Sequence, residues 1–183
     1  MRTIVQQAFM IGKHFKGKAF YPILNYALGK SEAQLIETNL VHTQPTDLAQ
    51  EFQCFNSLNR NVKRPMYHAS LSLPLGEQLE NARWKQVAQE FLTQMGFNHN
   101  AFVIVRHSDR PHDHIHIIAS RIRFDGSCVS DSWNHYQLQA VTRQLEQMFE
   151  LTPVPASWER QQNSVTQCQK QSICLPQKKQ IEL

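Results

Sequence analysis

Apolar and small polar residues alternate along the first of three segments that predict strands. Such alternation predicts strands, because successive side chains of a strand point to opposite faces of a sheet. In the first segment His68, Ser70 and Ser72 share one face. Pro74 ends that segment. The predicted strands cover residues 66–73, 101–107 and 114–123, and a turn over roughly 108–113 joins the last two into a hairpin.

Apolar residues recur at helical spacing in four other segments. The helices predicted from these positions run over roughly residues 22–28, 46–55, 79–95 and 138–149. Pro22 lies near the first turn of the first helix, where its missing N–H costs little. Thr43 or Thr46 can cap the second helix, and Gly96 closes the third.

The N-terminal residues give weaker signals. Residues 1–11 predict a strand, and residues 12–20 predict a basic loop punctuated by glycine. Further along, Asp125-Gly126 is a hairpin signal that predicts a short strand over residues 128–130.

The order of these elements predicts the α+β class. We expect a central, mainly antiparallel sheet with helices packed on it. Pro153 and Pro155 end the regular pattern, and the sequence beyond them is rich in glutamine. We therefore expect one domain over residues 1–158 and a polar, flexible tail over residues 159–183.

Composition favours a cytoplasmic protein. The four cysteines are scattered without a Cys-x-x-Cys pair, which favours a reducing compartment. No apolar stretch is long enough for a membrane segment, and the N-terminus lacks the cleavage site of a secretory signal.

Positive charge is concentrated near the N-terminus. Residues 1–30 contain five basic residues and no acid, whereas the whole chain has a formal net charge of only +4. This segment is either an ordinary solvated surface or an edge that contacts phosphate groups. The basic residues are Arg2, Lys13, Lys16, Lys18 and Lys30.

A cluster of histidines supplies the strongest chemical signal. His114 and His116 project from the same face of one predicted strand, and His107 ends the strand that precedes it. Three imidazoles that converge in this way can bind one metal ion and leave coordination positions open, as catalysis requires. Asp109 is a candidate to orient an imidazole, and His112, nearer the apex of the turn, is a weaker ligand candidate.

The ligand type restricts the metal only loosely. Imidazoles favour zinc, manganese, cobalt or nickel over magnesium. A phosphate substrate would add oxygen ligands, so we expect Mg²⁺ or Mn²⁺ in the working complex, with Zn²⁺, Co²⁺ and Ni²⁺ as alternatives.

Three segments carry a resemblance to a known family. The run His107–His116, followed by an apolar strand and Arg121, resembles the third motif of the plasmid mobilisation relaxases. These MobA/VirD-type nucleases belong to the HUH endonuclease superfamily. Residues 25–30 resemble the family's first motif, and residues 65–74 resemble the strand before its central helix.

The resemblance implies a relaxase that nicks and rejoins single-stranded DNA at a plasmid transfer origin during conjugation. In this family a tyrosine attacks a phosphodiester and leaves a 5′-phosphotyrosyl link and a free 3′-OH. Tyr26 matches that tyrosine, and His107, His114 and His116 match the metal ligands. Accessory mobilisation proteins are further expected partners.

The resemblance to relaxases also suggests roles for other residues. Tyr21 is the alternative nucleophile, and His68 is a candidate to contact the site or the DNA. Tyr67 is less suitable because it alternates away from His68. The expected DNA contacts are Lys13, Lys16, Lys18, Lys30 and Arg121.

Two other function classes remain open. A non-catalytic, metal-stabilised nucleic-acid-binding protein would retain the basic edge and the exposed aromatic residues. A two-histidine RNA phosphoesterase would use His68-Ala-Ser70, but the chain offers no second His-x-Ser motif to pair with it.

Overall fold

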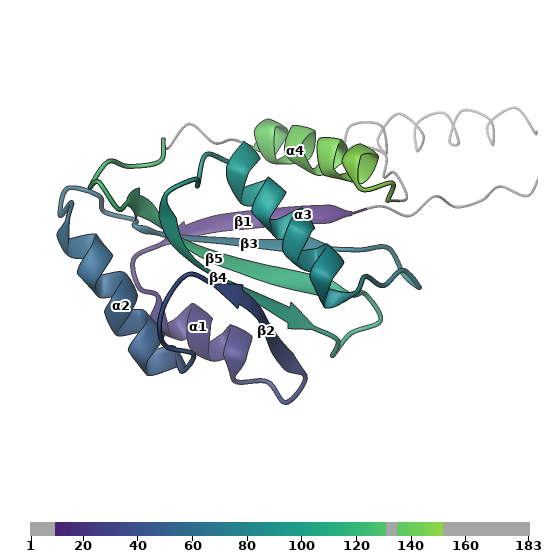
Figure 1. Ribbon diagram of the computed structural model, residues 1–183, viewed down its shortest axis with the longest axis horizontal. Helices are drawn as coiled ribbons and strands as arrows, with labels where there is room; N and C mark the ends of the chain where they lie inside the picture. Colours follow the sequence, from purple (N-terminus) through teal and green to yellow (C-terminus); the bar gives the residue numbers. More distant parts are fainter. Residues whose placement is uncertain (1–9, 131–134, 152–183) are drawn as a thin grey trace, which may run out of the picture.

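The computed structural model describes residues 10–130 and 135–151. Five strands and four helices occur in these residues, as drawn in Figure 1. In chain order they are β1 (Ile11–Gly17), α1 (Tyr21–Leu28), β2 (Ala33–Thr38), α2 (Pro45–Ser57), β3 (Met66–Ser72), α3 (Asn81–Gln94), β4 (Asn100–His107), β5 (His114–Arg123) and α4 (His135–Met148). No helix among them has the length and apolar character needed to cross a membrane.

The strands form one antiparallel sheet in the order β1-β3-β5-β4-β2. Strand β5 is therefore central, and nine of its ten residues are buried. This arrangement confirms the predicted α+β class and the predicted hairpin of β4 and β5. The histidines of that hairpin consequently lie on strands that are paired with a neighbouring strand on both sides.

Helices cover the sheet on both faces (Figure 1). Helices α3 and α4 pack on one face, where Trp84, Phe91 and Leu145 are fully buried. Helices α1 and α2 pack on the other, against Val103 and Ile118 among others. Burying one such apolar side chain contributes roughly 1.5–3 kcal/mol, so the two layers fix the sheet between them.

The second face is only partly covered. Helices α1 and α2 contact β2 and β5. On the same face, Ile11 and Phe15 of β1 are 43% and 49% exposed. The face of β1 next to these helices is therefore open to solvent, and Ser70 and Ser72 of β3 beside it are partly exposed.

The sequence prediction is wrong for part of one edge strand of the sheet and omits the other edge strand. Residues 12–20 do not form only a loop, because β1 continues to Gly17. Strand β2 was not predicted at all. Both are edge strands, and every residue of β1 is at least partly exposed, so its sequence lacks the apolar repeat of a buried strand.

Smaller differences concern caps and the last hairpin. Gln44 precedes α2 without a side-chain cap, so neither Thr43 nor Thr46 has that role, and Pro45 begins the helix. The strand expected at residues 128–130 is a single bridge between Ile122 and Cys128. Residues 1–9, Pro153, Pro155 and the predicted tail lie outside the described residues.

Asp113 anchors the β4–β5 hairpin, which carries His107, His114 and His116, to the face of the sheet that α3 covers. Its carboxylate accepts hydrogen bonds from Trp84 Nε1 at 2.9 Å and from the Leu79 backbone at 3.0 Å. Arg106 donates to both carboxylate oxygens, at 2.9 and 3.0 Å. These bonds tie the turn before His114 to α3 and to β4.

Replacing Asp113 with Asn should destabilise the protein by about 2–4 kcal/mol, because the amide NH₂ group would face the Arg106 guanidinium inside the protein. Urea unfolding measures the free energy of unfolding. Glu32→Gln, at an exposed carboxylate without an ion pair among the described residues, is the matched control and should have almost no effect. Equal midpoints for both variants would show that Asp113 does not anchor the hairpin.

Candidate metal and tyrosine site

The β4–β5 register brings three histidines together. His107 pairs directly with His114, and His116 lies two residues further along on the same face. One potential ligand nitrogen from each imidazole lies within 4.8 Å of the others. All three side chains are buried, so little water competes for their nitrogens.

Hydrogen bonds leave one nitrogen of each imidazole for a metal. His107 Nε2–H donates to the Ala27 carbonyl oxygen at 2.6 Å, and His114 Nδ1–H donates to the His112 carbonyl oxygen at 3.0 Å. His107 Nδ1 and His116 Nε2 are buried and have no hydrogen-bond partner among the described residues. A divalent cation bound by these lone pairs would satisfy them, so the donor set fits a metal ion.

His68 supports His116 from the neighbouring strand β3. Nε2 of His68 lies 2.8 Å from Nδ1 of His116, and the two rings stack with centroids 5.0 Å apart. Burial lowers the pKa of His68 to about 4 and that of His116 to about 3. Burial also lowers the pKa of His107. The neutral imidazole, the form that binds metals, is thereby favoured.

Tyr26 faces these histidines from helix α1. Its ring centroid lies 5.6 Å from that of His116 and 6.2 Å from that of His107. The side chain is 43% exposed, so a substrate can reach it. The hydroxyl oxygen accepts a hydrogen bond of 3.4 Å from Lys30 Nζ, one helical turn further along.

The other described tyrosines lie elsewhere. Tyr21 is exposed at the start of α1 and does not line the pocket beside the histidines. Tyr67 is buried on the opposite face of the sheet, as its alternation with His68 predicts. Tyr136 is exposed on α4. The geometry therefore favours Tyr26 as the tyrosine of the site.

Asp109 interacts chiefly with Lys30. Asp109 Oδ2 lies 2.6 Å from Lys30 Nζ, and the bond lowers the pKa of Asp109 and raises the pKa of Lys30. Asp109 Oδ1 is 3.8 Å from His114 Nε2, which is beyond hydrogen-bonding distance. The His112 carbonyl, rather than Asp109, orients the His114 ring.

A pocket of about 480 Å³ opens beside the histidines on the uncovered part of the sheet. Its lining combines imidazoles and Tyr26 with Lys13 of β1, Ser70 of β3 and Arg110 of the β4–β5 turn. Sequence reasoning did not select Arg110, although its position between His107 and His112 was a usable signal. The site thus joins metal-binding groups, a phenol and cations around one open cavity.

The predicted DNA contacts separate into groups. Lys13 and His112 line the pocket, and Lys30 lies at Tyr26. Lys16 pairs with Tyr67 and so belongs to the opposite face. Lys18 lines a different pocket. The buried Arg121 donates to the backbone carbonyls of Arg64 and Val129, which directs its guanidinium away from the histidines.

Divalent metal should stabilise the protein through the three histidines. At a Mn²⁺ concentration of about 100 times Kd, the free energy of unfolding should rise by about 2.7 kcal/mol. His114→Ala should abolish most of that increase, because it removes one ligand nitrogen. Thermal unfolding with and without Mn²⁺ measures the effect.

His99→Gln is the control, since His99 is exposed and precedes β4 at the end of that strand opposite His107. It should retain the full response to Mn²⁺. An equal response in the His114 and His99 variants would contradict the metal site.

Comparison with known families agrees with this geometry. No curated protein matches the chain significantly. A family model described as relaxase, MobA/VirD2-like, nuclease domain matches residues 24–151. The matched range starts just before Tyr26 and includes all three histidines. The chain belongs to the MobA/VirD2-like relaxase family, whose nuclease-domain model matches residues 24–151.

Proposed function

We propose that this protein is a metal-dependent, site-specific relaxase that nicks and rejoins single-stranded DNA at a plasmid transfer origin. The observation that carries the proposal is the position of Tyr26, partly exposed and edge-on to His107 and His116 over an open pocket. Nucleophile and metal-binding groups are thus close enough to act on one phosphodiester.

In the proposed reaction the Tyr26 oxygen attacks the phosphorus of the scissile phosphodiester. A new bond forms between phosphorus and the tyrosine oxygen, and the bond between phosphorus and the 3′ oxygen breaks. The phenol loses its proton, and the departing 3′ oxygen gains one. The products are a 5′-phosphotyrosyl link and a free 3′-OH, and attack by that hydroxyl in the reverse direction reseals the strand.

The charge of the scissile phosphate requires stabilisation during this attack. A divalent ion held by His107, His114 and His116, with Mg²⁺ or Mn²⁺ as the expected species, would supply Lewis-acid stabilisation. Arg110 and Lys13 line the same pocket and can contact flanking phosphates. Ser70 can donate a hydrogen bond to the same backbone.

Lys30 is assigned a role at the nucleophile in addition to any DNA contact. Its ammonium donates to the Tyr26 hydroxyl, which orients one lone pair and stabilises negative charge on the oxygen as the proton leaves. Asp109 holds Lys30 in place through the 2.6 Å bond. This pair therefore positions Tyr26 for attack.

Tyr26→Phe should abolish covalent capture of DNA while binding survives, because only the attacking oxygen is removed. The protein is mixed with Mg²⁺ and a labelled pool of single-stranded oligonucleotides containing a randomised segment, and adducts are separated under denaturing conditions. The trapped fragments should be attached through their 5′ phosphate, and their sequences define the recognised site.

Tyr21→Phe is the matched control and should form adducts at the wild-type level. Adducts in the Tyr26→Phe variant would overturn the assignment of the nucleophile. Binding of the pool without any adduct in the wild-type protein would favour the non-catalytic nucleic-acid-binding protein.

Lys30→Met should slow adduct formation by about 10- to 100-fold at saturating DNA, because a charge-stabilising donor at the reacting oxygen is lost. Single-turnover kinetics on a captured sequence separates this rate from the affinity for DNA. Lys30→Arg should recover part of the rate, and Lys85→Met, on α3 across the sheet, should leave it unchanged. A loss confined to affinity would reduce Lys30 to a DNA contact.

A further inference from the structure

A second pocket lies at the far end of the open sheet face. It has a volume of about 570 Å³ and is lined by Lys18, by the last turn of α2 and by residues 59–65. Three cations, Lys18, Arg60 and Lys63, border it, and no acidic residue does. All three are exposed and have no ion-pair partner among the described residues.

Nothing in the local structure accounts for three unpaired cations here. Cations do stabilise the C-terminus of a helix, but the effect falls off within the last turn. Helix α2 ends at Ser57, so Lys63 follows it by six residues, and Lys18 comes from a separate loop. Like charges gathered without counter-charges repel one another, which favours an anionic ligand.

Strand β1 connects this pocket with the histidine site. Lys13 and Phe15 line the first pocket, Gly17 follows on the same face without a side chain, and Lys18 lines the second pocket. Strand β3 runs alongside, with His68 opposite Phe15 and Met66 opposite Gly17. Five residues of strand span about 17 Å, so an extended polymer a few nucleotides long can reach from one pocket to the other.

The surface between the pockets suits a single-stranded nucleic acid. Phe15 is 49% exposed, and its ring packs edge-on against His68 with centroids 5.0 Å apart. A base can stack on such a held aromatic ring, while flanking cations contact phosphates. The amide groups of Gln53 and Asn56 in the second pocket add hydrogen-bonding groups without adding negative charge.

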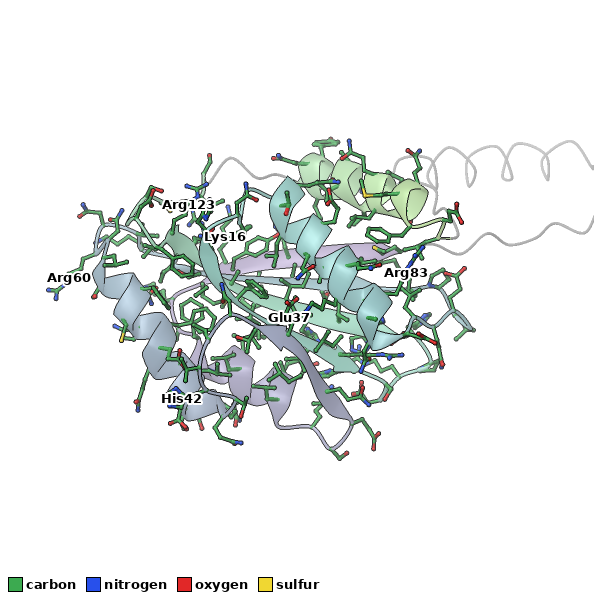
Figure 2. The ribbon with its side chains drawn as sticks, viewed as in Figure 1. Lys16, Glu37, His42, Arg60, Arg83 and Arg123 are labelled. Carbon is green, nitrogen blue, oxygen red and sulfur yellow. The ribbon has the colours of Figure 1, made fainter. Side chains whose placement is uncertain are left out.

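We infer that the pocket of Lys18, Arg60 and Lys63 is a second DNA-binding site, which holds the strand that continues from the scissile phosphate along β1. The inference rests on the proposed function for the position of the scissile phosphate, but its binding step needs neither metal nor Tyr26. Figure 2 shows Arg60 directed outward beyond α2, whereas Arg83 lies well away from it beside α3 and α4.

The test measures binding of oligothymidylates of increasing length, in EDTA, as a function of salt. Wild-type affinity should rise with length until the strand spans both pockets. Arg60→Gln/Lys63→Gln should lose that rise for the longer strands, and the salt dependence of its affinity should weaken by a slope of about 1.4, since two phosphate contacts on a single strand disappear. Adding Lys18→Gln to this double variant should weaken the salt dependence further.

The matched control is Arg83→Gln/Lys85→Gln, which removes the same charge from α3. It should keep the wild-type length dependence and salt slope. An unchanged slope in Arg60→Gln/Lys63→Gln would overturn the inference, and so would an equal loss in the control. A variant that loses affinity for polyglutamate but not for DNA would instead mark a surface for acidic proteins.

The experiments distinguish failure of the proposed nuclease function from failure of the proposed second DNA-binding site. Tyr26→Phe should retain the length-dependent binding, so binding at Arg60 and Lys63 without any covalent capture supports the second site and contradicts the nuclease. Covalent capture with no change of binding in the Arg60/Lys63 variant supports the nuclease and contradicts the second site.

Discussion

The register between β4 and β5 is the constraint on which the site depends. Because side chains of a strand alternate with a period of two, a slip of one residue in β5 would move His114 and His116 to the face covered by α3 and α4. Asp113 opposes such a slip, since its position between the histidines directs its carboxylate to Trp84 and Arg106 on that face. The hairpin is thus fixed on one face so that the other can present its imidazoles.

A second constraint connects the histidines with the helix that carries Tyr26. His107 donates to the carbonyl of Ala27, the residue after Tyr26. This bond directs the other His107 nitrogen toward the triad and limits how far α1 can move from the sheet. The Lys30–Asp109 bond joins the end of α1 to the β4–β5 turn in a second place. The geometry of the tyrosine and of the ligand set is therefore determined jointly.

The sequence predicts the central part of this arrangement well and its edges poorly. Strands β3, β4 and β5 are buried over most of their length and are correspondingly apolar, so their positions and the facing histidines could be predicted. Strands β1 and β2 lie at the edges, where solvent removes the apolar signal. The Ala27 and Lys30 contacts depend on how α1 docks, which no local pattern encodes.

Parity along a strand could have improved the choice of DNA contacts. Parity does separate Lys16 from Lys13, because β1 pairs with β3 without an irregularity. Parity does not extend to Arg121, because the pairing of β5 with β4 is irregular between Ala119 and Arg123. Arg121 is instead excluded by its burial and by its hydrogen bonds to the backbone carbonyls of Arg64 and Val129. Charge alone therefore assigns too many residues to the DNA-binding surface. A basic residue should be assigned as a DNA contact only after its strand and face are known.

The incomplete cover of the sheet has a physical cost that binding would offset. Leaving Ile11, Phe15 and Tyr26 nearly half exposed forgoes apolar burial that a longer α1 could have supplied. Phe15 and Tyr26 line the same pocket as two cations, Lys13 and Arg110. A polymer with aromatic bases and charged phosphates would cover both kinds of group at once, whereas an acidic protein surface would leave the rings unmatched. The shape and chemistry of this face thus favour a nucleic acid over a protein as its ligand.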